Sequence, residues 1–491
     1  MKTRLSLLIL LLATGLYSCE GNGPSPSDVQ PGREDGKEEG TTGSNRVDES
    51  LTVNLTRVKG KTVSDRLLGF NLVYANNPDA LWADSRWTDA IKAVKPGFLR
   101  YPGGTVTTYY HWNSLNGNPK LDSWDPAYNR SQDRDASEYM DLDEYFSVIA
   151  RTGAEPMLGI NCNSAFVYDR LEEGIEEALA LMKRARDKGY AVKYWYLGNE
   201  PFASDGNGGT WSPEDYAGMV NAFAPRMKAF DPSIKIIVND HANMVKHSDD
   251  YDTILSLAGQ WIDVMDVHFY WDHGNATWAR WLKHTPCSMS GGNAYEAEVD
   301  AMREVARRNG CPDLEFASLE WNCGPSTNAT DPLTTAGQVT LIQGEMLMQF
   351  MRGGLDIACF WPLFWTGDSA HRGFFDKSSG QRLPIADVMR NYAAFLGKNL
   401  VETTLNRTRE HVMVLAVQDP STKRLEVAFL NKNAVSIGVS FAGAVSGSGL
   451  PVPVVSYYMD DSLVSICTEE RTEASGSPVV VRPFSLTFIT L

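Results

Sequence analysis

Two glutamates, Glu200 and Glu320, each stand at the end of an apolar, aromatic-rich run of the sequence. Tyr194–Leu197 leads to the first and Leu314–Leu319 leads to the second. Aromatic and aliphatic residues favour strands, and Pro201 cannot continue a hydrogen-bonded ladder, so we expect each carboxylate at a strand end. Either glutamate alone could be a solvated loop residue. Two strand-terminal carboxylates together are what a two-carboxylate glycosidase needs.

The elements that must position these glutamates alternate between strand and helix from residue 65 to residue 398. Parallel strands joined by helices close into a (β/α)8 TIM barrel when eight such units follow one another, which makes the fold class α/β. Strands are predicted at residues 67–73, 98–101, 156–160, 194–197, 234–238, 262–269, 314–319 and 356–360, with amphipathic helical segments between them.

The carboxyl ends of barrel strands form one face, and catalytic side chains belong there. Polar and aromatic residues stand at these predicted strand ends and are the candidate substrate-binding residues: Arg100, Asn161, Asn199, His268, Tyr270 and Trp361. Asp240 and His241 end the fifth strand and could also line the cleft, and we assign no role to His111. The long segment 105–137 could form a wall of the site.

From residue 399 the pattern changes to short strand-like runs separated by turns rich in Gly, Pro, Asn and Asp. This pattern predicts a C-terminal antiparallel β-sandwich over residues 399–491. The β-like segment 51–64 precedes the first barrel strand, and we expect it to join the sandwich as an N-terminal strand.

The first 18 residues carry Lys2 and Arg4 and then an apolar run, residues 5–12, that is too short to span a bilayer. This segment resembles a bacterial lipoprotein signal peptide, which implies lipidation at Cys19. Residues 19–50 are rich in small and charged residues and predict a flexible tether. The expected location is therefore the outer membrane, the cell surface or the periplasm, with membrane contact only through the lipid.

The composition limits the kinds of molecule that the protein is expected to bind. The formal net charge is −16 without an evident basic cluster, which argues against a nucleic acid partner. Thirteen Trp and nineteen Tyr offer flat faces of the kind that carbohydrate-binding proteins place against sugars. The cysteines after Cys19 match no zinc-ligand spacing, so we expect no metal and no cofactor.

Four local motifs resemble those of the clan A retaining glycoside hydrolases, most of all the family 51 α-L-arabinofuranosidases. In those enzymes the first barrel strand leads to a sugar-binding Glu, where this chain has Asn71. Asn71 is the candidate substrate-binding residue at that position, and the difference leaves the sugar open. The motifs are Phe98-Leu99-Arg100-Tyr101-Pro102-Gly103-Gly104, Gly198-Asn199-Glu200-Pro201, His268-Phe269-Tyr270 and Leu319-Glu320-Trp321-Asn322.

The resemblance implies a retaining mechanism with Glu320 as nucleophile and Glu200 as acid/base. The two carboxyl groups should then lie about 5–5.5 Å apart. We expect Arg100 and Tyr270 to keep Glu320 ionised, and burial to keep the proton on Glu200.

The same resemblance gives roles to two further side chains. Asn199 should bind the sugar 2-hydroxyl, and Trp361 should form a platform beneath the sugar.

Three functions remain open from the sequence. The first is a retaining hydrolase that acts on arabinose-like or xylose-like units of plant or algal polysaccharides or oligosaccharides. The second is a clan A hydrolase of other specificity, such as an endo-glucanase, a xylosidase or an agarase. The third is a surface lipoprotein that binds glycans without cleaving them. A binding protein has no need for two carboxylates, which argues against the third.

Overall fold

The computed structural model describes residues 47–491, apart from 116–117, 122–123, 125–136, 204–210, 241–242, 289–292, 365–371, 377–378 and 444–448. The predicted signal peptide, Cys19 and nearly all of the predicted tether lie outside these residues, as does His241. No helix within the described part of the chain has the length and apolar character needed to cross a membrane.

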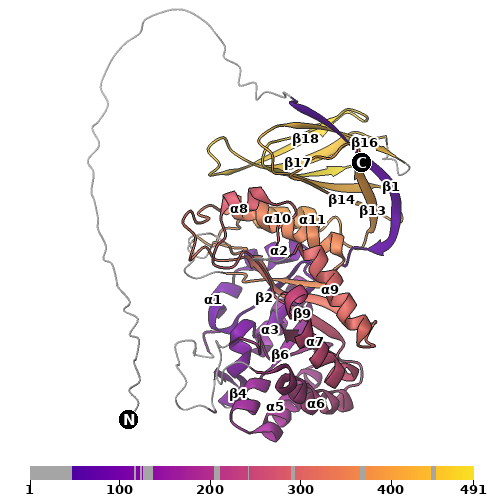
Figure 1. The fold of residues 1–491 in the computed structure, drawn as a ribbon. Helices are drawn as coiled ribbons and strands as arrows, with labels where there is room; N and C mark the ends of the chain where they lie inside the picture. Colours follow the sequence, from indigo (N-terminus) through magenta and orange to yellow (C-terminus); the bar gives the residue numbers. More distant parts are fainter. Residues whose placement is uncertain are drawn as a thin grey trace, which may run out of the picture. The chain divides into compact units, whose positions relative to one another are not determined.

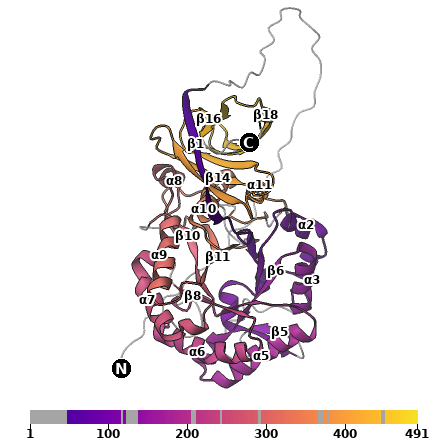
Figure 2. The same cartoon turned by 90° about the vertical axis from the view of Figure 1, so that its right-hand side faces the viewer.

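A barrel of parallel strands forms the core of the larger unit. Within the described residues its eight strands are paired in a closed ring, because β9 pairs with both β8 and β11. The predicted TIM barrel is therefore confirmed, and Figure 2 shows its strands inside a ring of helices. The strands in order are β2 (Gly69–Asn71), β3 (Phe98–Tyr101), β6 (Glu155–Ile160), β7 (Tyr194–Leu197), β8 (Lys235–Asp240), β9 (Val264–Val267), β11 (Glu315–Cys323) and β12 (Ile357–Phe360).

The interior of the barrel is filled by side chains from alternate strand positions, as its geometry requires. Buried aromatic and aliphatic residues such as Phe98, Tyr196 and Leu319 form one cluster there. Toward the carboxyl ends of the strands, the next inward positions are polar. The packed interior of the barrel therefore fixes the positions of the residues at the carboxyl ends of its strands.

Amphipathic helices surround the strands and explain the apolar spacing seen in the sequence. Helix α6 begins with a capping box between Ser212 and Asp215, and Pro213 occupies its first turn. The helices are α1 (Asp79–Trp82), α2 (Ser85–Ala93), α3 (Leu142–Thr152), α4 (Cys162–Val167), α5 (Leu171–Asp187), α6 (Pro213–Phe230), α7 (Met244–Ala258), α8 (Trp278–Lys283), α9 (Tyr295–Arg308), α10 (Ala336–Gly353) and α11 (Pro384–Tyr392).

A second, mostly antiparallel sheet forms the sandwich (Figure 1). Strand β1 (Glu49–Thr62) pairs with β13 (Asn399–Leu405) and with β16 (Ile437–Gly443), which confirms that an N-terminal strand completes this sheet. The other strands are β14 (Val412–Gln418), β15 (Leu425–Asn431), β17 (Val452–Met459), β18 (Ile466–Glu473), β19 (Val479–Val481) and β20 (Ser485–Thr490).

The sandwich packs on the barrel through helix α10. The helix contacts β14, β17, β18 and β20, and nearly all of its side chains are buried. Lys432, just after β15, forms a fully buried ion pair with Glu345 of α10 at 2.8 Å. Glu345 also accepts hydrogen bonds from Trp281 and from the backbone of Cys287, so the charge pair is surrounded by donors as burial requires.

Several elements differ from the sequence prediction. Part of the predicted long loop forms a hairpin of β4 (Tyr110–Leu115) and β5 (Asn118–Leu121). The predicted sixth strand is divided into β9 and β10 (Phe269–Trp271), because His268 interrupts the ladder. Strands β13, β18 and β19 and helices α4, α7 and α8 were not predicted. These elements are short, edge-located or rich in polar residues, so their apolar pattern is weak.

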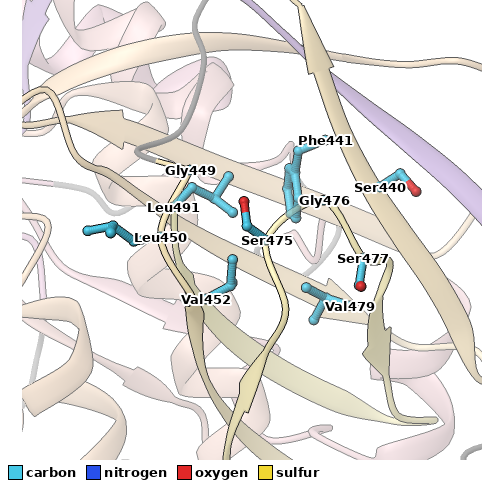
Figure 3. Close-up of a pocket in the computed structure, with 10 residues that line it drawn as sticks. All are labelled: Ser440, Phe441, Gly449, Leu450, Val452, Ser475, Gly476, Ser477, Val479 and Leu491. Carbon is cyan, nitrogen blue, oxygen red and sulfur yellow. The ribbon is translucent and has the colours of Figure 1, made fainter.

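The sandwich also contains a hollow of about 210 Å³ (Figure 3). Phe441, Val452, Val479 and Leu491 lie around it together with serine hydroxyl groups. None of its ten labelled lining residues is an acid or a base. The chemistry of the molecule must therefore be sought at the barrel.

Candidate active site

Both predicted catalytic glutamates lie at the face formed by the carboxyl ends of the barrel strands. Glu200 follows β7, whereas Glu320 lies within β11, which extends to Cys323 and is longer than predicted. A carboxylate oxygen of Glu200 and one of Glu320 lie within 4.8 Å of each other, with His268 within the same distance of both. The sequence places these two residues 120 positions apart. The barrel brings them together because all of its βα units open toward one face.

Glu320 is buried and receives two strong donors. Arg100 Nη1 donates to Oε1 at 2.8 Å, and the Tyr270 hydroxyl donates to Oε2 at 2.9 Å. Each oxygen therefore has one donor, which holds the carboxylate plane in a single orientation. A carboxylate fixed in this way can act as a nucleophile in its ionised form.

Arg100 is only 1% exposed, and further contacts hold its guanidinium in place. Its Nη1 also donates to Asn71 Oδ1 at 2.9 Å, and its Nη2 donates to Asn199 Oδ1 at 2.6 Å. The guanidinium lies over the ring of Tyr196, with 4.3 Å from Cζ to the ring centroid. The predicted pairing of Arg100 with the nucleophile is thus present in the structure.

Asn71 positions Arg100 more directly than it faces a substrate. Its amide nitrogen donates to the backbone oxygens of Leu319, at 2.8 Å, and Phe360, at 3.2 Å. The side chain is 1% exposed. The candidate sugar-binding residue at the first strand therefore links the ends of three strands beneath the site.

Glu200 reaches the site through an unusual backbone turn. Gly198 has φ 70°, and Glu200 itself has φ 44°, in the left-handed region that few non-glycine residues adopt. The backbone N–H of Glu200 donates to Asn239 Oδ1 at 3.0 Å, which holds this turn against strand β8. The turn directs the Glu200 carboxyl toward His268.

His268 connects the two glutamates. Its Nδ1 lies 2.7 Å from Glu200 Oε1 and 3.7 Å from Glu320 Oε2. Its Nε2 lies 3.3 Å from Asp266 Oδ2. The imidazole is 1% exposed, so these contacts are made in a water-poor environment.

The charges around His268 decide where protons reside. Burial lowers the pKa of His268, but Glu320 and Asp266 outweigh it and raise that pKa to about 10. Burial raises the pKa of Glu200, and the hydrogen bond and charge of His268 reverse this, so the net direction is downward. We predicted a proton resting on Glu200 itself. The structure instead offers the imidazole as its partner, so Glu200 and His268 together hold one proton.

The pKa of Glu320 moves in the opposite direction. Its deep burial raises the pKa, and the charges of His268 and Arg100 only partly offset that. The tyrosine that donates to it, Tyr270, has a pKa well above its ordinary value because of burial and the nearby carboxylates, so its hydroxyl remains a donor.

Glu200, His268 and Glu320 are also the one group of described residues whose spacing could hold a metal ion. Arg100 is bound to Glu320 at 2.8 Å, and its permanent charge would repel a cation at this place. The donors on both Glu320 oxygens also occupy the positions that a ligand would use. The arrangement fits acid–base and nucleophilic chemistry better than metal binding.

The remaining candidates are placed differently. Trp361 follows β12 and is half-buried, and the absence of a side chain at Gly104 leaves room for its ring. Asn161 caps helix α4 by accepting from the Ser164 backbone at 3.0 Å. Asp240 is buried at the end of β8. The structure thus leaves Trp361 available as a platform and gives Asn161 a role in its helix.

Two site residues were not found from the sequence. Asp266 and Asn239 both lie inside predicted strands or at their ends, buried beneath the glutamates. A polar residue within an apolar strand, as in Val264-Met265-Asp266-Val267, was the available signal. It indicates a buried partner but does not say which one.

Comparisons with known proteins found relatives in sequence and in fold. No family model matches the chain. An intracellular exo-α-(1→5)-L-arabinofuranosidase of Bifidobacterium longum is 26% identical over 255 residues, which are 48% of this chain and 43% of that protein. α-L-Arabinofuranosidase C of Emericella nidulans is 27% identical over 274 residues, which are 51% of each chain. The resemblance to the α-L-arabinofuranosidases is confirmed.

The extent of these similarities differs between sequence and structure. The chain spans about half the length of the curated relatives it matches. The crystal structure of an α-L-arabinofuranosidase from Thermotoga maritima superimposes with a TM-score of 0.67 at 20% identity, covering 90% of this chain and 99% of that one. This second similarity concerns the fold, in which barrel and sandwich are both shared.

Proposed function

We propose that this protein is a retaining glycoside hydrolase with α-L-arabinofuranosidase-like activity. The observation that carries the proposal is the pair of carboxyls within 4.8 Å, one bound by an arginine and a tyrosine and the other by a histidine. Inverting enzymes separate their carboxyls by about 6.5–9.5 Å to admit a water molecule, whereas retaining enzymes keep them about 5–5.5 Å apart. The short separation therefore supports the retaining mechanism.

In the first step, Glu320 attacks the anomeric carbon and the glycosidic bond breaks. Glu200 protonates the departing oxygen, and the proton comes from the pair that Glu200 forms with His268. Charge on Glu320 disappears as the glycosyl-enzyme forms. In the second step, Glu200 takes a proton from water, the resulting hydroxide attacks the same carbon, and Glu320 departs as a carboxylate.

Asn199 and Trp361 complete the proposed sugar site. Asn199 Oδ1 accepts from Arg100, which leaves the amide N–H groups of Asn199 to donate to a sugar hydroxyl. Such a bond to the 2-hydroxyl strengthens in the oxocarbenium-like transition state. Trp361 offers a flat, half-buried face at the end of the eighth strand.

The names of the relatives favour arabinofuranosides as substrates, and the buried Asn71 makes specificity the point to test. We would measure release of nitrophenol from α-L-arabinofuranoside, β-D-xyloside and β-D-glucoside, and size the products from arabinan, arabinoxylan, xyloglucan and agarose. The activity is expected on the arabinofuranoside, with monosaccharide as product. Oligosaccharide products from a glucan or agarose would favour the second function considered above, and binding without turnover would favour the third.

The stereochemistry tests the mechanism separately from the substrate. Proton NMR of the first product formed is expected to show the α anomer from an α-arabinofuranoside. Initial formation of the β anomer would contradict the double-displacement mechanism.

We also propose that the chain is exported as a lipoprotein anchored at Cys19, because of the signal-like residues 1–18. Labelled fatty acid should be incorporated into the wild-type protein expressed in a bacterial host and not into Cys19→Ser. Equal labelling of the two proteins would contradict the anchor.

A further inference from the structure

Asp266 lies beneath both glutamates without touching either in the hydrogen-bond network. It is on strand β9 and is only 1% exposed. A carboxylate this deeply buried needs several donors to offset the loss of water. Its contacts therefore show what the residue is for.

Two of these contacts lead to the two catalytic positions. Asp266 Oδ1 accepts from the backbone N–H of Leu319 at 2.7 Å, one residue before Glu320. Asp266 Oδ2 accepts from the side-chain amide of Asn239 at 2.9 Å, and the other end of that amide accepts from the Glu200 backbone at 3.0 Å. One side chain thus fixes the strand of the nucleophile and the turn of the acid/base.

The third contact concerns the imidazole of His268. Its Nε2 is buried and has no aligned hydrogen-bond partner among the described residues, and the Asp266 carboxylate lies 3.3 Å away. An unprotonated Nε2 would set a lone pair against a negative charge. A protonated Nε2 is attracted to it, so Asp266 favours the form of His268 with hydrogen on Nε2.

With hydrogen fixed on Nε2, the other ring nitrogen, Nδ1, is the one that exchanges a proton with Glu200. A neutral imidazole with hydrogen on Nε2 accepts at Nδ1, and the proton between His268 and Glu200 then belongs to Glu200. When the shared proton moves from Glu200 to Nδ1, His268 becomes an imidazolium and Glu200 becomes ionised. In both states the pair retains one proton for the leaving group, and in neither state is Glu200 ionised beside a neutral imidazole.

Other titratable and charged groups surround His268 and its partners. Glu320, Asp266 and Glu200 act on His268 itself. Arg100 and His273 act on Glu200, Tyr270 donates to Glu320, and Arg372 acts on Tyr270 and His273. Asp266 differs from the other groups in facing Nε2, on the side of the ring away from the two glutamates.

We propose that Asp266 is a positioning residue that holds the acid-competent form of the His268–Glu200 pair and fixes Glu200 relative to Glu320. This proposal rests on the proposed glycosidase function. It deepens that function by assigning the protonation of the acid/base to a residue that contacts neither substrate nor leaving group.

The substitution Asp266→Asn tests the proposal because it preserves shape and removes the charge. If the amide oxygen of the new side chain keeps the Leu319 N–H, its NH2 group replaces Oδ2 and faces His268 Nε2. The hydrogen bond from Asn239 to Oδ2 is lost in the same variant. The imidazole must then carry its hydrogen on Nδ1 and donate to Glu200, which stabilises the ionised carboxylate and removes the acid. A carboxylate-to-amide change beside a histidine is known to reduce rates through the wrong tautomer.

The loss of the acid can be measured by comparing substrates whose leaving groups differ in their need for protonation. With a sugar or alkyl leaving group, which needs protonation, kcat/KM of Asp266→Asn should fall about 10²–10⁴-fold, the range attributed to general acid catalysis. With a dinitrophenyl arabinofuranoside, whose leaving group needs no proton, it should fall less than about tenfold. An equal fall on both substrates, or no fall on either, would overturn the proposal.

Asp356→Asn is the matched control. Asp356 is partly buried and, like Asp266, accepts a backbone N–H of strand β11, from Phe316 at 2.9 Å, but at the opposite end of the barrel. Its substitution should lower the thermal midpoint without any dependence of the rate on the leaving group. A leaving-group effect in Asp356→Asn as large as in Asp266→Asn would show that general loosening of β11 explains both, and would overturn the proposal.

A second measurement needs neither activity nor a folded Asp266 variant. Nitrogen NMR of histidine-labelled wild-type protein, with the His268 signal assigned by its absence in His268→Gln, reports hydrogen on Nε2 directly. Protonated Nε2 from pH 5 to 8 is expected. Unprotonated Nε2 would overturn the proposal even if the enzyme is active. Protonated Nε2 in a protein inactive on every glycoside would leave the arrangement intact and place the failure in the proposed function.

Discussion

Strand β11 carries two glutamates, each with an arginine and a tyrosine, yet the two clusters differ in what they can do. At the first residue of the strand, Glu315 contacts Arg66 at 3.2 Å, Lys235 at 2.6 Å and the Tyr194 hydroxyl at 3.1 Å. Further along the strand, Glu320 contacts Arg100 and Tyr270. Residue types alone therefore do not distinguish a structural cluster from a reactive one.

Three features make the difference. The Glu315 side chain is 19% exposed and is surrounded by two cations, so the Lys235 and Arg66 contacts outweigh partial burial and lower its pKa. Glu320 is deeply buried, has a second carboxyl within 4.8 Å and shares a histidine with it. Close like charges and burial raise proton affinities, and this prepares groups for chemistry at neutral pH.

The largest effect should separate these two glutamates. Glu320→Gln removes the proposed nucleophile and should lower kcat by at least about 10⁴-fold on the best glycoside found. Glu315→Gln, the matched change at the start of the same strand, should leave kcat within about tenfold of the wild type. Steady-state kinetics of both proteins would check this. Comparable losses in the two variants would abolish the distinction between the clusters.

Glu200→Ala should have the next largest effect. It removes the acid, so kcat/KM should fall about 10²–10⁴-fold for poorly activated leaving groups and much less for dinitrophenyl glycosides. Added azide should restore turnover of the activated substrate and give a glycosyl azide with the substrate's anomeric configuration. An azide product of the opposite configuration would show that no covalent intermediate precedes it.

The basic limb of the pH profile should depend on His268. Glu320 and Asp266 raise the His268 pKa to about 10, so the proton shared with Glu200 is released only at high pH in the wild type. In His268→Gln the proton must rest on Glu200 alone, and the basic limb of kcat/KM should move at least about one unit lower. The profile of a substrate that requires protonation would be measured. An unchanged limb would exclude proton sharing.

Glu315 should contribute to the stability of the fold and not to catalysis. Glu315→Gln leaves Arg66 and Lys235 without their shared carboxylate and should lower the free energy of unfolding by about 1–3 kcal/mol at neutral pH, between surface and buried ion pairs. The lowered pKa means that this stabilisation is present above the ordinary glutamate range and is lost as pH falls below about 4. Denaturation of both proteins at pH 7 and pH 3.5 would show a smaller difference at the lower pH.

The smallest expected effect tests whether a position at the catalytic face is sufficient for function. Asn161 is at the end of β6 and caps helix α4. Asn161→Ala should lower stability by about 1 kcal/mol, the usual value of a helix N-cap, and leave kcat unchanged. A strong rise in KM without loss of stability would return Asn161 to the predicted substrate-binding set.

Much of the site could be predicted because barrel geometry converts sequence position into spatial position. Once Arg100, Glu200 and Glu320 are recognised at strand ends, the fold requires them to share one face. The contacts that set their reactivity could not be predicted in the same way. Asn71 and Asp266 act through backbone groups of other strands, and the partners of a buried polar residue depend on how neighbouring strands align.

The sequence by itself determined the barrel, the sandwich with its N-terminal strand, and the choice of the two glutamates as the candidate reactive pair. These depend on local periodicity and on strand ends, which are properties of short segments. Only the tertiary structure decided that His268 lies between the two carboxyls and that Asp266 faces its far nitrogen. Proton affinities in a buried cluster depend on distances of a few ångströms between residues far apart in the chain, and no local pattern encodes those distances.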